Sequence, residues 1–166
     1  MSSPADATLA WDFTLPALAG GTLDFAAHKG NVLLVVNTAS MCGYTPQYKS
    51  LQQLHKTLGP RGLSVIGIPS GDFRQEYADD AAVKTFCEKN YGVEFPLATL
   101  SHVTGAAAIP FYAWVRAQCG GWEPAWNFSK VLIDRNGRVG GHFAAGDDPG
   151  TGKLATAIHT LLAGNI

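Results

Sequence analysis

The sequence predicts an α/β fold with a central mixed β-sheet, helices on both faces and an N-terminal β-hairpin. Two continuous apolar segments, residues 32–36 and 63–68, are typical of strands that are covered on both faces. A segment with helical spacing of apolar residues, 46–58, separates them. Because strands and helices alternate in this way, we expect helices to pack on both sides of one sheet.

The individual elements follow from local signals. Residues 11–15 and 22–25, joined by a double glycine, are the expected N-terminal hairpin. Thr45 is suited to the N-cap of the first long helix and Pro46 to its first position. The first two long strands, joined through this helix, are expected to be parallel. Further helices are expected at 81–90, 109–117 and 152–162, and a second hairpin pairs 131–134 with 138–143.

Length and composition indicate one domain spanning residues 1–166, in which segment 1–10 is expected to be flexible. The net charge of −1, without a run of basic residues, argues against nucleic acid and against a stable association with membranes. No apolar run reaches the ~20 residues of a membrane helix, and no signal peptide is visible. We therefore expect a cytoplasmic protein, with a periplasmic location and a removed signal peptide as the alternative. The three cysteines and five histidines are dispersed, so we expect neither a metal site nor a cofactor.

Cys42 is the candidate reactive residue. It follows a buried strand and precedes a helix, which is where open α/β sheets place their working sites. The positive end of the helix dipole and the free N–H groups there favour a thiolate over a thiol. The alternative is that Cys42 is a small core residue, as most free cysteines are. Its position in a loop with glycine and proline favours the reactive interpretation.

The residue three positions after Cys42 is Thr45 and not a second cysteine. A local dithiol cycle of the thioredoxin type is therefore disfavoured. Cleavage of a peroxide O–O bond needs only one thiolate, which becomes a sulfenic acid. The sequence thus favours a peroxidase over a disulfide reductase.

These residues carry a family resemblance. Segments 37–48, 91–96 and 126–128 resemble the signature motifs of the glutathione peroxidase family, and the resemblance covers nearly the whole chain. It implies a thioredoxin-like fold and reduction of hydrogen peroxide or organic hydroperoxides by Cys42, hence an antioxidant role in the response to oxidative stress. It also implies that the Trp126 indole and the Asn127 amide donate hydrogen bonds to the sulfur, although Trp126 by itself would suit core packing.

Two positions depart from the family pattern. Asp72 stands where the family has the glutamine of its catalytic tetrad, and Met41 replaces a common lysine. An ionised carboxylate beside the sulfur would oppose thiolate formation. We therefore expect Asp72 to be protonated and able to donate a proton, paired with Arg74, or turned away. In each case Gln75 is the candidate for the missing amide.

The sulfenic acid must then be reduced. In many relatives a second cysteine resolves it and thioredoxin reduces the disulfide, and Cys87 lies in the corresponding region, one residue from the usual position by our alignment. The alternative is that Cys87 is a buried apolar helix residue and glutathione is the reductant. The short connection 117–126 resembles that of monomeric relatives, which accept lipid hydroperoxides. Cys119 has no family counterpart. The competing functions are a non-catalytic peroxide sensor and another thioredoxin-like thiol oxidoreductase.

Overall fold

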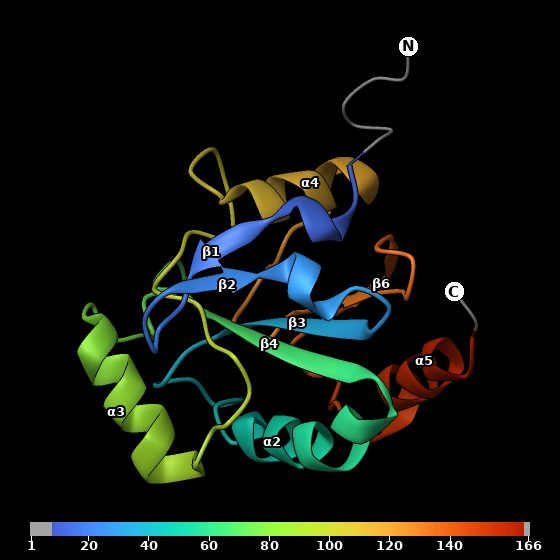
Figure 1. Cartoon of the computed structure of the whole chain (residues 1–166). Coiled ribbons are helices and arrows are strands. Elements are labelled where there is room, and N and C mark those ends of the chain that lie inside the picture. Colours follow the sequence, from blue (N-terminus) through green and yellow to red (C-terminus); the bar gives the residue numbers. More distant parts are fainter. Residues whose placement is uncertain (1–7, 165–166) are drawn as a thin grey trace.

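A four-stranded mixed sheet forms the centre of the structure, a computed structural model that describes residues 8–164 (Figure 1). The strand order is β4-β3-β5-β6. The bounds are Val32–Thr38 for β3, Leu63–Pro69 for β4, Lys130–Ile133 for β5 and Val139–Phe143 for β6. Strands β3 and β4 are parallel, whereas β5 is antiparallel to both β3 and β6. The predicted mixed sheet is confirmed.

Strands β3 and β4 are connected through helix α2 (Gln47–Leu58) and the short 3₁₀ helix η3 (Gly59–Arg61). Every residue of both strands is buried, which explains why the sequence shows continuous apolar runs and no alternation. The predicted parallel pair with a helical crossover is therefore confirmed.

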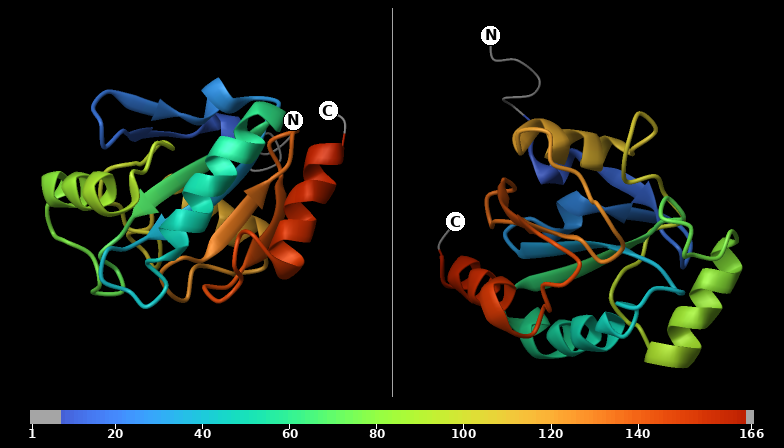
Figure 2. Two further views of the ribbon diagram at one scale, coloured as in Figure 1. Left: turned by 90° about the horizontal axis from the view of Figure 1, so that it is seen from below. Right: turned by 180° about the vertical axis from the view of Figure 1, so that it is seen from behind.

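Helices cover the two faces of the sheet. The remaining helices are α3 (Asp80–Tyr91), α4 (Pro110–Gln118) and α5 (Gly152–Ala163). Leu34 and Val36 share a core with helices α2, α3 and α5, whereas Leu33 and Val35 share a second core with α4 and the hairpin. Figure 2 shows α4 on the opposite side of the sheet from α2 and α5.

The N-terminal hairpin is a separate two-stranded sheet of β1 (Thr14–Pro16) and β2 (Thr22–Asp24). It is flanked by the 3₁₀ helices η1 (Ala10–Asp12) and η2 (Phe25–His28), so its strands are shorter than the sequence suggests. Of the segment expected to be flexible, residues 1–7 lie outside the described part. Ala10 is fully buried, and its amide donates to the Gly137 carbonyl.

Three loops meet at one edge of the sheet. Strands β3 and β4 end there, and β5 begins there because it runs in the opposite direction. The Ser70 amide donates to the Thr38 carbonyl at 3.0 Å, and the Phe128 amide donates to the Asn37 carbonyl at 2.6 Å. The loops that follow β3 and β4 and the loop that precedes β5 are thus fastened together, and all the predicted site residues except Cys87 lie on them. No helix in the described range 8–164 is long and apolar enough to cross a membrane.

Candidate active site

Cys42 lies in the loop between β3 and α2 and is 8% exposed. Its Sγ accepts a hydrogen bond from the Tyr44 amide at 3.3 Å. An amide N–H that points at sulfur stabilises negative charge on it, as do the free N–H groups of the first helical turn. The loop therefore supplies the polar environment that a thiolate requires.

Thr45 holds this loop in shape. Its hydroxyl accepts from the Cys42 amide at 2.9 Å and donates to the Ala39 carbonyl at 2.9 Å. The predicted role of Thr45 as N-cap of α2 is wrong: the helix begins at Gln47, and Pro46 occupies the cap position. The Thr45 hydroxyl is turned back into the loop because both of its hydrogen-bond partners lie there.

Gln75 joins the Cys42 loop to the loop before β5. Its backbone carbonyl accepts from the Met41 amide at 2.9 Å. Its side-chain Oε1 accepts from Asn127 Nδ2 at 3.0 Å. The structure therefore brings together three residues that are far apart in the sequence, and it leaves the Gln75 Nε2 group as a further N–H donor in this region.

Asn127 is fully buried, whereas the neighbouring Trp126 is 39% exposed. The Trp126 ring packs against Phe73, with 5.5 Å between the ring centroids. The Trp126 carbonyl accepts from Asn37 Nδ2 at 2.9 Å, which ties the loop to the end of β3. Within residues 8–164, no hydrogen bond joins Cys42 Sγ to Trp126 or Asn127, so their contact with the sulfur stays a prediction.

Two residues beside the site have left-handed backbone conformations that non-glycine residues rarely adopt. Arg74, immediately before Gln75, has φ +62°, and Phe128, immediately after Asn127, has φ +63°. Such conformations cost about 1–3 kcal/mol each and persist where the surrounding structure demands them. Here they accompany the two residues whose side-chain amides bond to each other.

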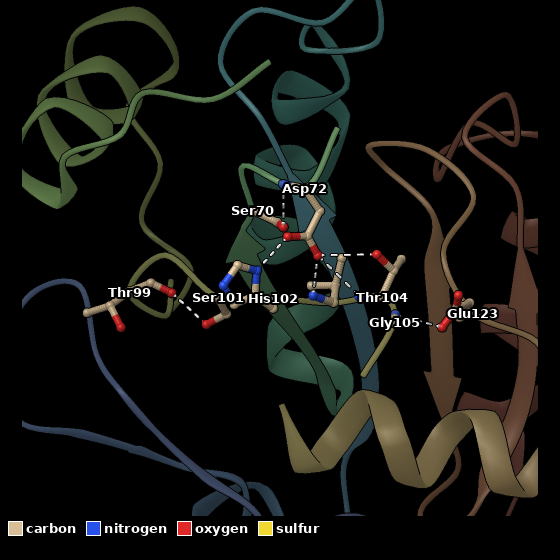
Figure 3. Close-up of polar contacts among 9 residues, drawn as sticks. Ser70, Asp72, Thr99, Ser101, His102, Thr104, Gly105 and Glu123 are labelled. Carbon is tan, nitrogen blue, oxygen red and sulfur yellow. Dashed lines mark hydrogen bonds and ion pairs between the residues drawn. The ribbon is translucent and has the colours of Figure 1, made fainter. Parts of the chain in front are cut away.

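Asp72 is bound to a different loop, as Figure 3 shows. Its carboxylate pairs with His102 Nδ1 at 2.7 Å and accepts from the Val103 amide at 2.7 Å and the Thr104 amide at 3.2 Å. Burial raises the pKa of Asp72, but the hydrogen bonds from His102 and the two amides outweigh it, so the pKa is lowered. Asp72 is therefore ionised at neutral pH.

This geometry corrects two of the alternatives for Asp72. The partner of the carboxylate is His102 and not Arg74. An ionised Asp72 also cannot donate a proton to a leaving group, so the proton-donor alternative is wrong. The third alternative, a carboxylate that is turned toward other groups, agrees with the structure. The role of Asp72 in the reaction stays a prediction.

Cys87 lies on α3 and is 1% exposed. Burial, together with the nearby carboxylates of Glu76 and Glu88, raises the pKa of its thiol to about 11, although the Tyr48 hydroxyl partly offsets this. Cys42 and Cys87 are both free thiols that belong to the same hydrophobic core. A disulfide between them therefore requires a movement of α3.

The surface next to Cys42 carries large apolar side chains. Met41 is 52% exposed and Tyr44 is 40% exposed, and both flank Cys42 in sequence. With the partly exposed Trp126 they form what we call the apolar rim of the site. Such side chains suit an apolar substrate better than a charged one.

Sequence reasoning missed four residues that shape this region: the hydroxyl-bearing Tyr48, the loop-organising role of Thr45, the carboxyl group of Glu76, and His102. Glu76 directly follows Gln75, so an acidic residue next to a candidate site residue was the available signal. No comparable local signal existed for His102, because 30 residues separate it from Asp72. In the described part of the chain, no group of three or more His, Cys, Asp or Glu residues could hold a metal ion.

Solved structures establish the class of fold. The crystal structure of Trgpx in its apo form matches with a TM-score of 0.74 and 30% identity, covering 95% of this chain and 98% of that one. The structure of T. cruzi GPX1 matches with a TM-score of 0.73 and 26% identity, over 95% and 98% of the two chains. A thiol:disulfide interchange protein of the thioredoxin family from Chlorobium tepidum matches with a TM-score of 0.67 and 21% identity, over 98% and 99%, which supports the fold alone. The chain has a thioredoxin-like fold with a single candidate thiol at the edge of its sheet, as the sequence predicted.

Sequence relatives then identify the family. A profile of the family described as glutathione peroxidase matches residues 10–116. The chain is 41% identical to the glutathione peroxidase homolog BsaA of Halalkalibacterium halodurans, over 83% of this chain and 90% of that protein. It is 38% identical to the hydroperoxy fatty acid reductase gpx1 of Synechocystis sp., over 98% of this chain and 100% of that protein. It is also 38% identical to the glutathione peroxidase-like peroxiredoxin 2 of Saccharomyces cerevisiae, over 87% and 91%. The chain belongs to the glutathione peroxidase family and is a thiol peroxidase, which confirms the predicted family and activity.

Proposed function

We propose that this peroxidase acts through Cys42, reduces organic and lipid hydroperoxides as well as hydrogen peroxide, and is regenerated through Cys87 by a thioredoxin. The observation that carries the proposal is the hydrogen bond from the Tyr44 amide to Cys42 Sγ, at the start of helix α2. It supports a sulfur that is held as an anion next to the protein surface.

The chemistry assigned to Cys42 is a two-electron oxidation. The thiolate attacks the terminal peroxide oxygen, the O–O bond breaks, and a sulfenic acid forms on sulfur. The departing alkoxide or hydroxide takes up a proton and leaves as an alcohol or water. The protein is oxidised and the hydroperoxide is reduced, so no cofactor is needed.

Amide groups near the sulfur would stabilise its negative charge. The Gln75–Asn127 hydrogen bond supports a role for this pair, because it fixes both side chains beside the Met41–Cys42 segment. In our assignment Gln75 Nε2 supplies the amide that the family takes from the position of Asp72. The Trp126 indole N–H is the third donor.

The apolar rim supports organic and lipid hydroperoxides as substrates. Met41, Tyr44 and Trp126 offer contact surface to an acyl chain without adding charge. One relative is named a hydroperoxy fatty acid reductase, which agrees with this substrate class. We expect the protein to act as a monomer, because the connection between α4 and β5 is short.

Cys87 is assigned the resolving role. A cavity of about 190 Å³ adjoins it on the side of residues 93–97 and leaves room for α3 to shift. Several relatives are named glutathione peroxidase-like peroxiredoxins, which supports a disulfide-based cycle and thioredoxin as the reductant. Such a cycle is suited to a reducing compartment such as the cytoplasm.

A turnover assay tests the proposal. The reduced protein is given cumene hydroperoxide with thioredoxin, thioredoxin reductase and NADPH, and separately with glutathione, glutathione reductase and NADPH. We expect many turnovers with thioredoxin, none with Cys42→Ser, and a loss of thioredoxin-dependent turnover with Cys87→Ser. Cys119→Ser, at the end of α4, is the matched control and should keep full activity. Turnover by Cys42→Ser would refute the role of Cys42, and a single turnover by the parent protein would indicate a peroxide sensor.

A further inference from the structure

A buried polar cluster lies beneath the Cys42 loop. Thr38 Oγ1, Ser40 Oγ, Tyr48 OH and Glu76 Oε2 are all buried, and none of these atoms has a hydrogen-bond partner. They come from three elements: the end of β3, helix α2 and the loop after β4. Buried polar atoms without partners cost about 1–3 kcal/mol each, so a group of four calls for a functional explanation.

Glu76 is the only acid among these four residues. Its Oε1 accepts from the Tyr77 amide at 2.9 Å, whereas its Oε2 points into the protein and accepts no hydrogen bond. The Ser40 hydroxyl lies near the carboxyl without completing a hydrogen bond of ordinary geometry. Burial raises the pKa of Glu76, and the contacts with Ser40 and Tyr77 offset only part of this. Glu76 therefore has an unoccupied carboxylate oxygen that gains a proton more readily than a surface carboxylate does.

The cluster adjoins Cys87. The Tyr48 hydroxyl lies beside the Cys87 thiol, and the charge of Glu76 acts on both groups. The other ionisable residues around Cys87 are Glu88 and Lys84, which form an exposed ion pair on α3 itself, and Glu94, which lines the adjoining cavity. Of all these groups, Glu76 is the acid that reaches Cys87 from the side of the Cys42 loop.

Cys87 must lose its proton before it can attack the sulfenic acid. With a pKa of about 11, only about one molecule in 10⁴ carries a Cys87 thiolate at pH 7. Deprotonation by bulk solvent would also create a second negative charge beside ionised Glu76, which is costly in a buried site. Transfer of the thiol proton to Glu76 avoids this cost, because the cluster then keeps a single negative charge throughout.

We infer that Glu76 accepts the proton of the Cys87 thiol, through the Tyr48 hydroxyl, in the step that forms the Cys42–Cys87 disulfide. The inference rests on the proposed resolving role of Cys87. In this step the Cys87 S–H bond breaks and the S–S bond forms as the Cys42 S–O bond breaks. The departing hydroxide takes a proton from solvent and becomes water, and Glu76 later returns its proton to solvent. Both sulfurs end at the disulfide level, so no further oxidant is required.

Glu76→Gln distinguishes proton transfer from simple electrostatics by the sign of its effect. Removal of a negative charge next to Cys87 makes its thiolate easier to form, so electrostatics alone predicts faster disulfide formation. Loss of a proton acceptor predicts slower formation, by about 100-fold or more. Glu88→Gln is the matched control: it also removes a charge that acts on Cys87, but its side chain is 60% exposed and lies outside the cluster.

The two steps are measured separately in single turnovers. Reduced protein is mixed with one equivalent of hydrogen peroxide, and quenched samples are analysed by mass spectrometry for the sulfenic acid, trapped with dimedone, and for the disulfide. We expect Glu76→Gln to leave sulfenic acid formation within about 2-fold of the parent and to slow disulfide formation, with Glu88→Gln at or above the parent rate. The disulfide rate of the parent should fall in acid as a carboxyl group is protonated, whereas the Glu76→Gln rate should rise only in alkali as the thiol ionises.

The outcomes separate the two proposals. If the parent forms the disulfide and Glu76→Gln forms it as fast or faster, the proton-acceptor role is refuted while the resolving role of Cys87 stands. The same holds if the pH profile of the parent shows only thiol ionisation, a result that does not depend on how well the variant folds. If the parent forms no intramolecular disulfide, the resolving role fails and this inference fails with it.

Discussion

Replacing Thr45 by valine tests whether the shape of the Cys42 loop controls the reaction. Valine has almost the same size and shape, but it cannot accept from the Cys42 amide or donate to the Ala39 carbonyl. Thr45 is only 4% exposed, so water does not readily replace the lost bonds. Each buried group left without a partner costs about 1–3 kcal/mol, and we expect the free energy of unfolding to fall by about 2–4 kcal/mol.

The kinetic effect follows from the bond to sulfur. The Tyr44 amide can donate to Cys42 Sγ only while the turn keeps its geometry, and Thr45 holds that turn. Hydrogen bonds to charged groups contribute about 1.5–3 kcal/mol, so loss of this one should slow attack of the sulfur on peroxide by about 10-fold or more. Stopped-flow mixing of the reduced protein with hydrogen peroxide, followed by intrinsic tryptophan fluorescence, measures the rate.

Thr57→Val is the control, because the Thr57 hydroxyl bonds only to the Gln53 carbonyl on the exposed surface of α2. It should change the oxidation rate by less than 2-fold. An oxidation rate of Thr45→Val equal to that of the parent would refute the reasoning, since the loop would then hold its geometry without this hydroxyl.

Three further predictions concern stability, each measured by urea unfolding. Asp72→Asn should lower stability at pH 7 by about 1–2 kcal/mol, and the deficit should vanish as pH falls through the lowered carboxyl pKa, because the parent then also loses its charge; a deficit that persists at pH 3 would contradict this. Gly67→Ala should cost about 1–3 kcal/mol because its Cβ would collide with the Leu97 side chain, whereas Gly59→Ala, with open space around its Cβ, should cost less than 1 kcal/mol; equal effects would refute the packing argument. The Cys87 thiol, with its pKa raised to about 11, should stabilise the parent relative to Cys87→Ala fully below about pH 9 and lose about 2 kcal/mol of this margin as pH rises through 11; a constant margin would show that the thiol is not buried as described.

The order of the elements was predictable because each one depends on signals within a few residues. The apolar runs of β3 and β4 and the double glycine between β1 and β2 act locally, and the structure has the strands where these signals place them. The boundaries were less certain: Trp11 belongs to a 3₁₀ helix and not to a strand, because the Asp12 carboxylate accepts from the Leu9 amide and closes a turn there.

The directions of the site side chains were not predictable from sequence. Asp72 and Gln75 are three residues apart on one loop, yet one is bonded to the loop at residues 102–104 and the other to Asn127. Both are polar, both are suited to a site, and nothing in their spacing distinguishes them. The distinction arises because the Val103 amide is placed to bind a carboxylate and Asn127 is placed to bind an amide.

The sequence by itself determined the fold class and the position of the reactive thiol, because the alternation of strands and helices and the junction at Cys42 are local properties of the chain. Only the tertiary structure decided which distant residues surround that thiol and that Glu76, Tyr48 and Cys87 lie together. The physical reason is that hydrogen bonds and burial depend on distance in space, and the antiparallel placement of β5 beside β3 brings together loops that are more than 50 residues apart.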